Sequence, residues 1–566
     1  MLRFNFLKKS VFVLLLAVAA TSCDEQLTEL NENPNGVDPS TANPNMTIPT
    51  ILTNTALSYQ NLNYGDLGGV AQYTQHDGWF GGHNHYDWDP NNWSGWYDIL
   101  RNNKFLYNRA VALDYKFHQG IALTMKSFIF GTITDLWGDA PYSQALMGDE
   151  SDEYLTPEYD SQEVIYKGII EDLKTAAALF ATGDKTGYLA GYDVYFNGDT
   201  EKWQKFANSL ILRYSMRLSE KLPEVAKAGI EAVYSSGVYM KTSADDAAMA
   251  YLGTTSGNSW PTAAQFDSDE GTNFRRKKPA QPFVNTLVKN NDPRLELWIN
   301  PVNVQWVADP SLAVAVDPYI RRNGVIMEGV QAMSELQLNA AIKAGDKFTR
   351  HYNPNLYEGE IDTAKYVGLP VGLRQPDYYN NNPTPGQSVQ NQHVSQLTDM
   401  FRQATGPLLR ARLATAAESH FILAQAALKG WNAGSAESNY YEGIKASLQT
   451  WGLADKYESF IEEPTVKYNG TLEQIIEQKW TSGFTMAAES WFDFRRTGLP
   501  ALKAGPASSE PVLPVRFIYG DNEVNVNSAN ADAAIARLED NQYTSLRGKN
   551  SQWAKPWLLQ GTGKPW

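Results

Sequence analysis

The densest group of polar and aromatic residues lies in one short segment, residues 75–89 (QHDGWFGGHNHYDWD). The rings of Trp79, Tyr86 and Trp88 could stack on the C–H faces of sugars, while His83 and neighbouring Asn and Asp side chains could bind hydroxyl groups. Ligand sites commonly combine apolar faces with a few placed polar groups. We therefore predict that this segment contributes to a surface that binds an uncharged polar ligand such as a glycan.

The same segment carries four alternating metal-capable residues, His83, His85, Asp87 and Asp89. Extended chain would point all four side chains to one side, so a divalent cation is an alternative ligand. No further ligand on a helix is apparent, and a glycine-flanked polar loop is the preferred interpretation. The acidic run 149–153 could hold Ca²⁺ but is more simply a solvated loop. No metal and no cofactor is expected.

Two further groups of aromatic and polar residues could extend the ligand surface. One combines Trp260 with Phe274 and Arg275, and the other is the run Arg374–Asn382 (RQPDYYNNN). Each ring could face a sugar or could instead fill contacts between a loop and the core. The predicted ligand-binding residues are Trp79, His83, Tyr86, Trp88, Trp260, Phe274, Arg275, Tyr378 and Tyr379.

These candidates must be positioned by a largely helical scaffold, because apolar residues recur at helical spacing in most of the chain. Possible capping boxes begin at Asp160 and Thr471. The stripes form pairs close to the roughly 34-residue unit of tetratricopeptide-like hairpins. The predicted pairs cover about residues 93–137, 160–219, 411–452 and 471–502.

The chain between the two groups of helix pairs, about residues 242–406, is rich in Gly, Asn, Pro and aromatic residues. Long irregular insertions of this kind usually carry function. The predicted fold class is all-α, mainly helical. Tetratricopeptide-like helix pairs would form a superhelical scaffold over residues 50–566, and the loop-rich insertion would supply the ligand face.

The N-terminus has the features of an export signal. Arg3, Lys8 and Lys9 precede an apolar run, residues 11–20, that is too short to span a bilayer. The chain has one cysteine, Cys23, placed directly after this signal. We therefore expect residues 1–22 to be a signal peptide, Cys23 to be the lipidated first residue of the mature protein, and residues 23–49 to be a tether. A disulfide framework is excluded by the cysteine count.

Composition narrows the function class. The 566 residues include 48 Lys and Arg against 63 Asp and Glu, for a net charge of −15. A nucleic-acid binder would need a basic face, so that class is disfavoured. The hydrophobic content of 43% is too high for a disordered chain, and the aromatic content of 12% suits either a large core or a ligand surface.

Six strings stand out along the chain, namely LWGDAPY (136–142), DPRL (292–295), YVGLPVG (366–372), AESHFILAQAA (417–427), ESWFDFRRTGLP (489–500) and LPVR (513–516). The string EQKW (477–480) and the lipidation signal accompany them. Taken in order, these strings resemble the SusD/RagB family of nutrient-binding outer-membrane lipoproteins. The resemblance covers nearly all of the mature chain.

The resemblance implies a tetratricopeptide-like scaffold and a surface lipoprotein of the outer membrane. It also implies a partner, a SusC-like TonB-dependent transporter that receives the captured nutrient. It implies binding of an oligosaccharide, or in some members a peptide, without catalysis. Arg495 and Arg496 fall within a family string and are interpreted as structural. A secreted glycoside hydrolase or lyase on a helical scaffold remains the alternative, because carboxylates suited to such chemistry are plentiful.

Overall fold

The computed structural model describes residues 41–268, 271–327, 333, 335–383, 385, 391–545 and 548–564. The predicted signal peptide, Cys23 and most of the predicted tether lie outside the described residues. The elements below all belong to the unit Asn45–Trp566. No helix among the described residues is long and apolar enough to cross a membrane.

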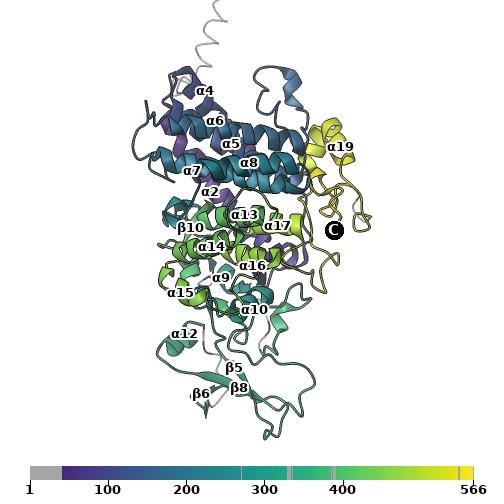
Figure 1. Cartoon of the computed structure of the whole chain (residues 1–566). Helices are drawn as coiled ribbons and strands as arrows, with labels where there is room; N and C mark the ends of the chain where they lie inside the picture. Colours follow the sequence, from purple (N-terminus) through teal and green to yellow (C-terminus); the bar gives the residue numbers. More distant parts are fainter. Residues whose placement is uncertain are drawn as a thin grey trace, which may run out of the picture. The chain divides into compact units, whose positions relative to one another are not determined.

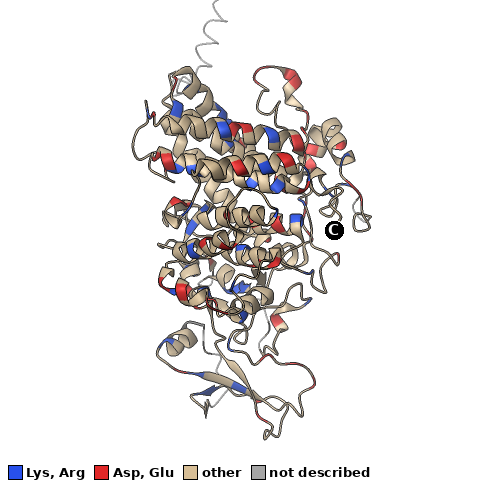
Figure 2. Cartoon of the chain, in the orientation of Figure 1, with Lys and Arg blue, Asp and Glu red and all other residues tan. Residues whose placement is uncertain are grey.

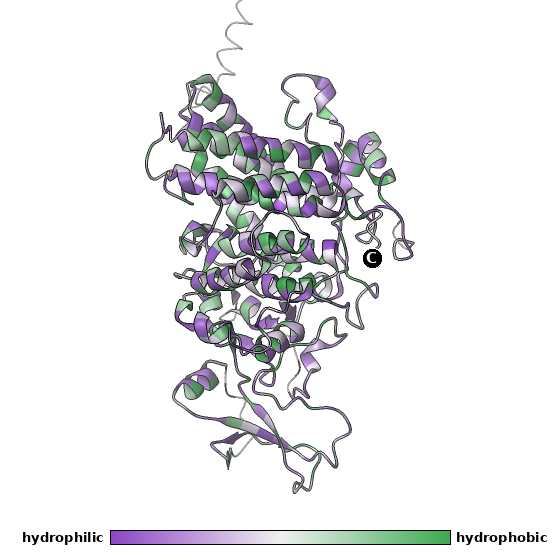
Figure 3. Ribbon diagram, viewed as in Figure 1, coloured by the Kyte–Doolittle hydropathy of each residue, from purple (hydrophilic) through white to green (hydrophobic). Residues whose placement is uncertain are grey.

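The N-terminal half is an array of antiparallel helices (Figure 1). Each helix from α4 to α8 packs against the next one in the chain, and α2 packs against α4. Helices α4, α6 and α8 each bury one apolar stripe in the core, whereas α5 is buried on nearly all sides. Apolar and polar residues are both visible along the helices (Figure 3). The helices are α2 (Ile48–Tyr64), α4 (Ser94–Ala112), α5 (Lys116–Trp137), α6 (Gln162–Ala181), α7 (Thr200–Arg217) and α8 (Pro223–Ser236).

The start of α6 differs from the prediction by one residue. Ser161 is the N-cap, and its Oγ accepts a hydrogen bond from the Val164 amide at 3.4 Å. The predicted cap at Asp160 is wrong, because that carboxylate accepts a bond from the Ser143 amide at 2.7 Å and ties the preceding loop to the helix. At Thr471 the predicted N-cap is confirmed, with Oγ1 accepting from the Gln474 amide at 3.3 Å. The reciprocal bond of a capping box is not formed, because Oε1 of Gln474 accepts from the Asn469 amide at 2.8 Å.

The C-terminal half supplies a second group of helices that packs against the first. Helix α13 contacts α7 and α8, and α17 contacts α2 and the short helix α3 (Asp66–Val70). The prediction of a mainly helical fold built from helix pairs is confirmed. The helices are α13 (Ala416–Leu428), α14 (Ala436–Thr450), α15 (Tyr457–Phe460), α16 (Leu472–Ser482), α17 (Ala487–Thr497), α18 (Asp521–Val526) and α19 (Ser528–Ala536).

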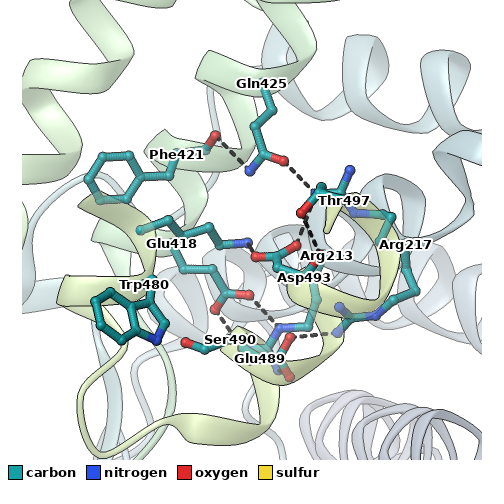
Figure 4. Close-up of polar contacts among 12 residues, drawn as sticks. Arg213, Arg217, Glu418, Phe421, Gln425, Trp480, Glu489, Ser490, Asp493 and Thr497 are labelled. Carbon is teal, nitrogen blue, oxygen red and sulfur yellow. Dashed lines mark hydrogen bonds and ion pairs between the residues drawn. The ribbon is translucent and has the colours of Figure 1, made fainter. Parts of the chain in front are cut away.

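A buried network of charged side chains joins the two groups of helices (Figure 4). Arg213 on α7 donates to both oxygens of Glu418 on α13, at 2.7 and 2.6 Å. Arg217 donates to Glu489 on α17 at 2.6 Å and lies 3.1 Å from Asp135 on α5. Buried charges are tolerated only when paired and hydrogen-bonded, so this set fixes the helices relative to one another.

The network continues through α16 and α17. Lys479 lies 2.6 Å from one oxygen of Asp493, and Arg496 donates to the other at 2.9 Å. Arg495 donates to the carbonyl of Asp135 at 2.8 Å. The two arginines are buried, which confirms their structural interpretation.

The region predicted as irregular insertion is more ordered than expected. Four short helices, α9 (Thr272–Arg276), α10 (Gln281–Lys289), α11 (Arg294–Trp298) and α12 (Glu335–Lys343), lie in it. Strand β5 (Gln305–Ala308) pairs in parallel with β8 (Phe348–Tyr352), which pairs with β6 (Arg321–Arg322) and through it with β7 (Val325–Ile326). This sheet and α12 enclose a small core of their own, made of Val304, Leu338 and Phe348.

Of the three two-stranded ribbons among the described residues, two join the insertion to chain outside it, and the third lies within the insertion. Their strands come from distant parts of the chain, which is why local periodicity does not reveal them. The antiparallel pairs are β1 (Thr74–His76) with β3 (Lys277–Pro279), β2 (Ala247–Ala250) with β10 (Arg410–Ala414), and β4 (Ile299–Asn300) with β9 (Gln396–Leu397).

Candidate ligand-binding site

Four segments distant in sequence meet around the β1–β3 ribbon. The Asp77 amide donates to the carbonyl of Arg276 at 3.1 Å, directly beyond the end of the ribbon. The Gly372 amide donates to Oε1 of Gln75 at 2.9 Å. The Ser509 amide donates to the carbonyl of His85 at 3.1 Å. Residues 75–89 are therefore held by the insertion and by the C-terminal chain.

Trp79 lies at the tip of this segment and is 64% exposed. Its backbone adopts φ +49°, a left-handed conformation that non-glycine residues rarely adopt. The guanidinium carbon of Arg276 lies 4.0 Å from the ring centroid and fixes the ring by a cation–π contact. A large apolar ring held in this way is suited to stacking on a ligand at little entropic cost.

The residue before Trp79 must be glycine for this contact to form. A Cβ atom built on Gly78 would lie 1.7 Å from Nη1 of Arg276. The Arg276 guanidinium can therefore approach the Trp79 indole only because residue 78 has no side chain.

The second and third predicted groups place three more candidates at or near the surface. Tyr378 is 55% exposed at the end of a short helical turn, Pro376–Tyr378. Tyr379 is half-buried, and burial raises the pKa of its phenol to about 12. Arg275 is half-buried, and its Nη2 donates to Oγ1 of Thr272 at 3.1 Å.

Electrostatics link the turn that carries Tyr378 to the Trp79 segment. Burial raises the pKa of the Asp77 carboxyl, Lys278 and Arg276 lower it, and the nearby charge of Asp377 raises it. Nζ of Lys278 lies 3.6 Å from Oδ2 of Asp77. Trp79, Arg275 and Tyr378 thus lie on segments that border the same cluster of charges.

Four predicted ligand residues are instead part of the hydrophobic core. Tyr86, Trp88, Trp260 and Phe274 are between 0% and 3% exposed, so the expectation that these rings lie on an open surface is wrong. The reason is that their loops fold back onto helices. Trp88 meets Phe517 edge to face with centroids 5.1 Å apart.

Trp260 shows the same behaviour. It packs edge to face on Tyr64 at 4.8 Å and on Tyr251 at 5.9 Å between ring centroids. Its side chain therefore fills a contact between the start of the insertion and α2, which was the alternative interpretation of the loop aromatics.

His83 is also buried and contacts protein rather than solvent. Its ring stacks on His76 with centroids 3.8 Å apart, and Nε2 lies 3.1 Å from Oγ1 of Thr74. Burial, followed by nearby positive charge, lowers the pKa of both imidazoles well below its usual range. Both rings are therefore neutral at pH 7.

The extended geometry assumed for the metal alternative is not found. Residues Gly81–His85 form a helical turn, and Nε2 of His85 lies 2.9 Å from the carbonyl oxygen of Leu373. Across the described part of the chain, no group of three or more His, Cys, Asp or Glu side chains is arranged to hold a metal ion.

Sequence reasoning missed Arg276, which the structure places against Trp79. The available signal was the basic run Arg275–Lys278, an unusual concentration of positive charge in an acidic chain. Lys277 within this run is buried, and burial lowers the pKa of its amine to about 7. Its Nζ donates to the carbonyl of Tyr64 at 2.7 Å.

Comparisons with solved structures agree with this architecture. A SusD homologue from Bacteroides fragilis aligns with a TM-score of 0.66 and 21% identity, over 92% of this chain and 99% of that one. A SusD homologue from Bacteroides uniformis aligns with a TM-score of 0.65 and 20% identity, over 91% and 99%. A chitin-binding SusD homologue from Flavobacterium johnsoniae aligns with a TM-score of 0.63 and 20% identity, over 92% and 99%.

Among curated proteins, none matches the sequence. One family profile matches most of the chain, over residues 36–308 and 346–520, and its description is starch-binding, associating with outer membrane. The gap in the match falls on the part of the insertion that contains β6, β7 and α12. The chain therefore belongs to the SusD-like family.

Proposed function

We propose that this protein is a cell-surface lipoprotein that captures an oligosaccharide and delivers it, without catalysis, to a SusC-like TonB-dependent transporter. Membership of the SusD-like family supports binding at the outer membrane. The chitin-binding description of the Flavobacterium johnsoniae homologue supports a carbohydrate as the ligand. The lipid anchor would be attached at Cys23.

The observation that carries the ligand assignment is the geometry of Trp79. Its ring is exposed, fixed by Arg276 and flanked by segments that carry Tyr378, Tyr379 and Arg275. Sugar C–H faces stack on such rings, and the half-buried Arg275 and Tyr379 can bond hydroxyl groups. We assign these four residues to the ligand surface and exclude the four buried aromatics from it.

The direct test is calorimetric titration of a glycan panel against the wild type, Trp79→Ala and Tyr378→Ala. The matched controls are Trp431→Ala and Tyr319→Ala. Trp431 also carries a cation–π contact, with Nζ of Lys429 5.9 Å from its ring, and Tyr319 is 40% exposed. Both controls lie outside the proposed surface. Loss of affinity in the first pair alone supports the assignment, and equal behaviour of the two pairs would refute it.

The same samples separate the alternatives. Products that accumulate from any glycan would favour a hydrolase or lyase over a binding protein. Saturable binding of peptides, with no binding of glycans, would show that the ligand is a peptide and not an oligosaccharide.

Anchor and transporter are tested in cells. Cys23→Ala is expected to move the protein from the outer-membrane fraction to the soluble fraction. Purification of the wild type from outer membranes in mild detergent is expected to recover a larger barrel protein. Membrane retention of the variant would contradict the anchor, and repeated recovery of the lipoprotein alone would contradict the complex.

A further inference from the structure

A polar pocket of about 310 Å³ lies beside the β2–β10 ribbon, on elements that do not contribute to the Trp79 surface. It is bordered by the first turn of α7, the turn that precedes β2, strand β10 and the end of α14. Its volume is at the lower end of the range for small-molecule sites. Its polar and charged lining residues include Lys202, Asp246, Arg410, Arg412 and Thr450.

Three of these residues are cations, and Asp246 is the carboxylate that opposes one of them, because burial lowers the pKa of Arg412 and the charge of Asp246 raises it. Lys202 is half-buried, Arg410 is exposed and Arg412 is buried. Within the described ranges, none of the three forms an ion pair with a carboxylate. This is unexpected in a chain with 63 acidic and 48 basic residues, where charges of both signs are interspersed along the helices (Figure 2).

Arg412 is the most informative of the three. Its Nη2 donates to the carbonyl of Leu408 at 2.9 Å, and its guanidinium carbon lies 4.6 Å from the centroid of the Trp451 ring. Its Nη1 is buried and has no hydrogen-bond partner among the described residues. A buried charged donor without an acceptor is costly, and a ligand oxygen would remove that cost.

The one carboxylate in the pocket is already engaged. Oδ1 of Asp246 accepts from the Ala416 amide at 2.9 Å, and Oδ2 accepts from Oγ1 of Thr450 at 2.8 Å. Burial raises the pKa of Asp246 to about 6, which weakens its charge further near that pH. The end of α14 adds roughly half a negative charge. Three cations outweigh these two contributions, so the local field favours an anion.

We propose that this pocket binds an oxyanion, namely the carboxylate, phosphate or sulfate group of a small ligand. Nη1 of Arg412 donates the buried hydrogen bond, while Arg410 and Lys202 neutralise the remaining charge at the mouth. Charge-assisted bonds of this kind are about twice as strong as neutral ones. The pocket has room for a sugar-sized body behind the charged group, so an acidic sugar is one source and an inorganic anion is another.

The test is titration of the full chain, purified in mild detergent, with sodium glucuronate, sodium phosphate, sodium sulfate and neutral glucose at constant ionic strength. We expect saturable 1:1 binding of at least one anion and none of glucose. The double variant Lys202→Gln/Arg410→Gln is expected to weaken anion binding at least tenfold. The control Arg101→Gln/Lys445→Gln removes the same charge from exposed positions elsewhere and is expected to leave it unchanged.

Each outcome decides the proposal. Binding of glucuronate supports an acidic sugar as the source, and binding of phosphate or sulfate alone supports an inorganic anion. No saturable binding, equal binding of glucose, or equal loss in the control variant would overturn it. Arg412→Gln is expected to abolish binding; if that buried variant does not fold, the double variant still decides. Neutral glycan affinity should be unchanged in the double variant, so this proposal and the proposed function fail independently.

Discussion

The buried ion network and the Trp79 surface both combine charged and aromatic residues, yet they differ in what those residues contact. In the network, Glu418, Glu489 and Asp493 are each bonded to a cation on another helix (Figure 4). Asp135 is bonded in the same way to Arg217. At the Trp79 surface, one arginine holds a ring whose surface is mostly open to solvent. Glu418, Glu489 and Asp493 of the network lie in the family strings, whereas Trp79 and Tyr378 lie outside them.

The network should show the largest effect on stability when it is broken. Glu489 accepts from Arg217 at 2.6 Å and from the hydroxyl of Tyr59 at 2.9 Å. Burial would raise its pKa, but Arg213 and Arg217 lower it below its usual range, so the carboxylate is charged at pH 7. Glu489→Gln removes one of the two carboxylates that pair with each of Arg213 and Arg217, so these buried cations are only partly compensated. The variant is expected to cost about 3–5 kcal/mol of unfolding free energy.

Chemical denaturation at pH 7 measures this loss. Glu163→Gln is the matched control, because Glu163 pairs with Lys167 at 2.5 Å on an exposed helix face, and such pairs contribute little. A loss of less than about 1 kcal/mol in Glu489→Gln would contradict the structural role of the network.

The buried aromatics that were expected at the surface offer the next test. Trp260→Ala removes a ring that is 1% exposed and packed on Tyr64 and Tyr251. A cavity of this kind costs about 3–5 kcal/mol. Thermal and chemical unfolding measure the cost. Normal stability combined with lost ligand affinity would return Trp260 to the ligand surface.

The stacked pair His76 and His83 predicts a pH dependence. Both folded pKa values lie below 6.5, so just below that pH the unfolded chain binds more protons than the folded one. Stability should therefore fall as the pH falls below about 6.5, by up to about 1.4 kcal/mol per pH unit for each imidazole. Asp66, whose pKa burial raises, acts in the opposite direction at lower pH.

Unfolding curves between pH 5 and 7.5 test this dependence. Burial also lowers the pKa of His118 to about 4 and that of His393 to about 3, so four imidazoles contribute to the slope. His83→Gln should therefore flatten the slope by up to about a quarter. An unchanged slope in the variant would show that another group carries the dependence.

The same contrast between local packing and contacts of distant segments explains which parts of the structure the sequence predicts. Helices such as α6 and α14 are predictable from their apolar periodicity, since each buries one stripe that local spacing defines. The β1–β3 ribbon pairs Thr74 with Pro279, about 200 residues apart, and no local pattern encodes that contact. Trp79 and Trp88 both follow an acidic or glycine residue in one segment, and only tertiary packing makes one exposed and the other buried.

The smallest expected effect on stability is at Trp79. Truncation to alanine removes a ring that is 64% exposed and a cation–π contact with Arg276, which at an exposed site contributes about 0.5–1 kcal/mol. We therefore expect a loss of unfolding free energy of no more than about 1 kcal/mol. Glycan affinity should fall about tenfold, which corresponds to about 1.4 kcal/mol. Trp79→Phe keeps an apolar face and should recover part of the affinity, whereas a purely structural role would make affinity follow stability in both variants.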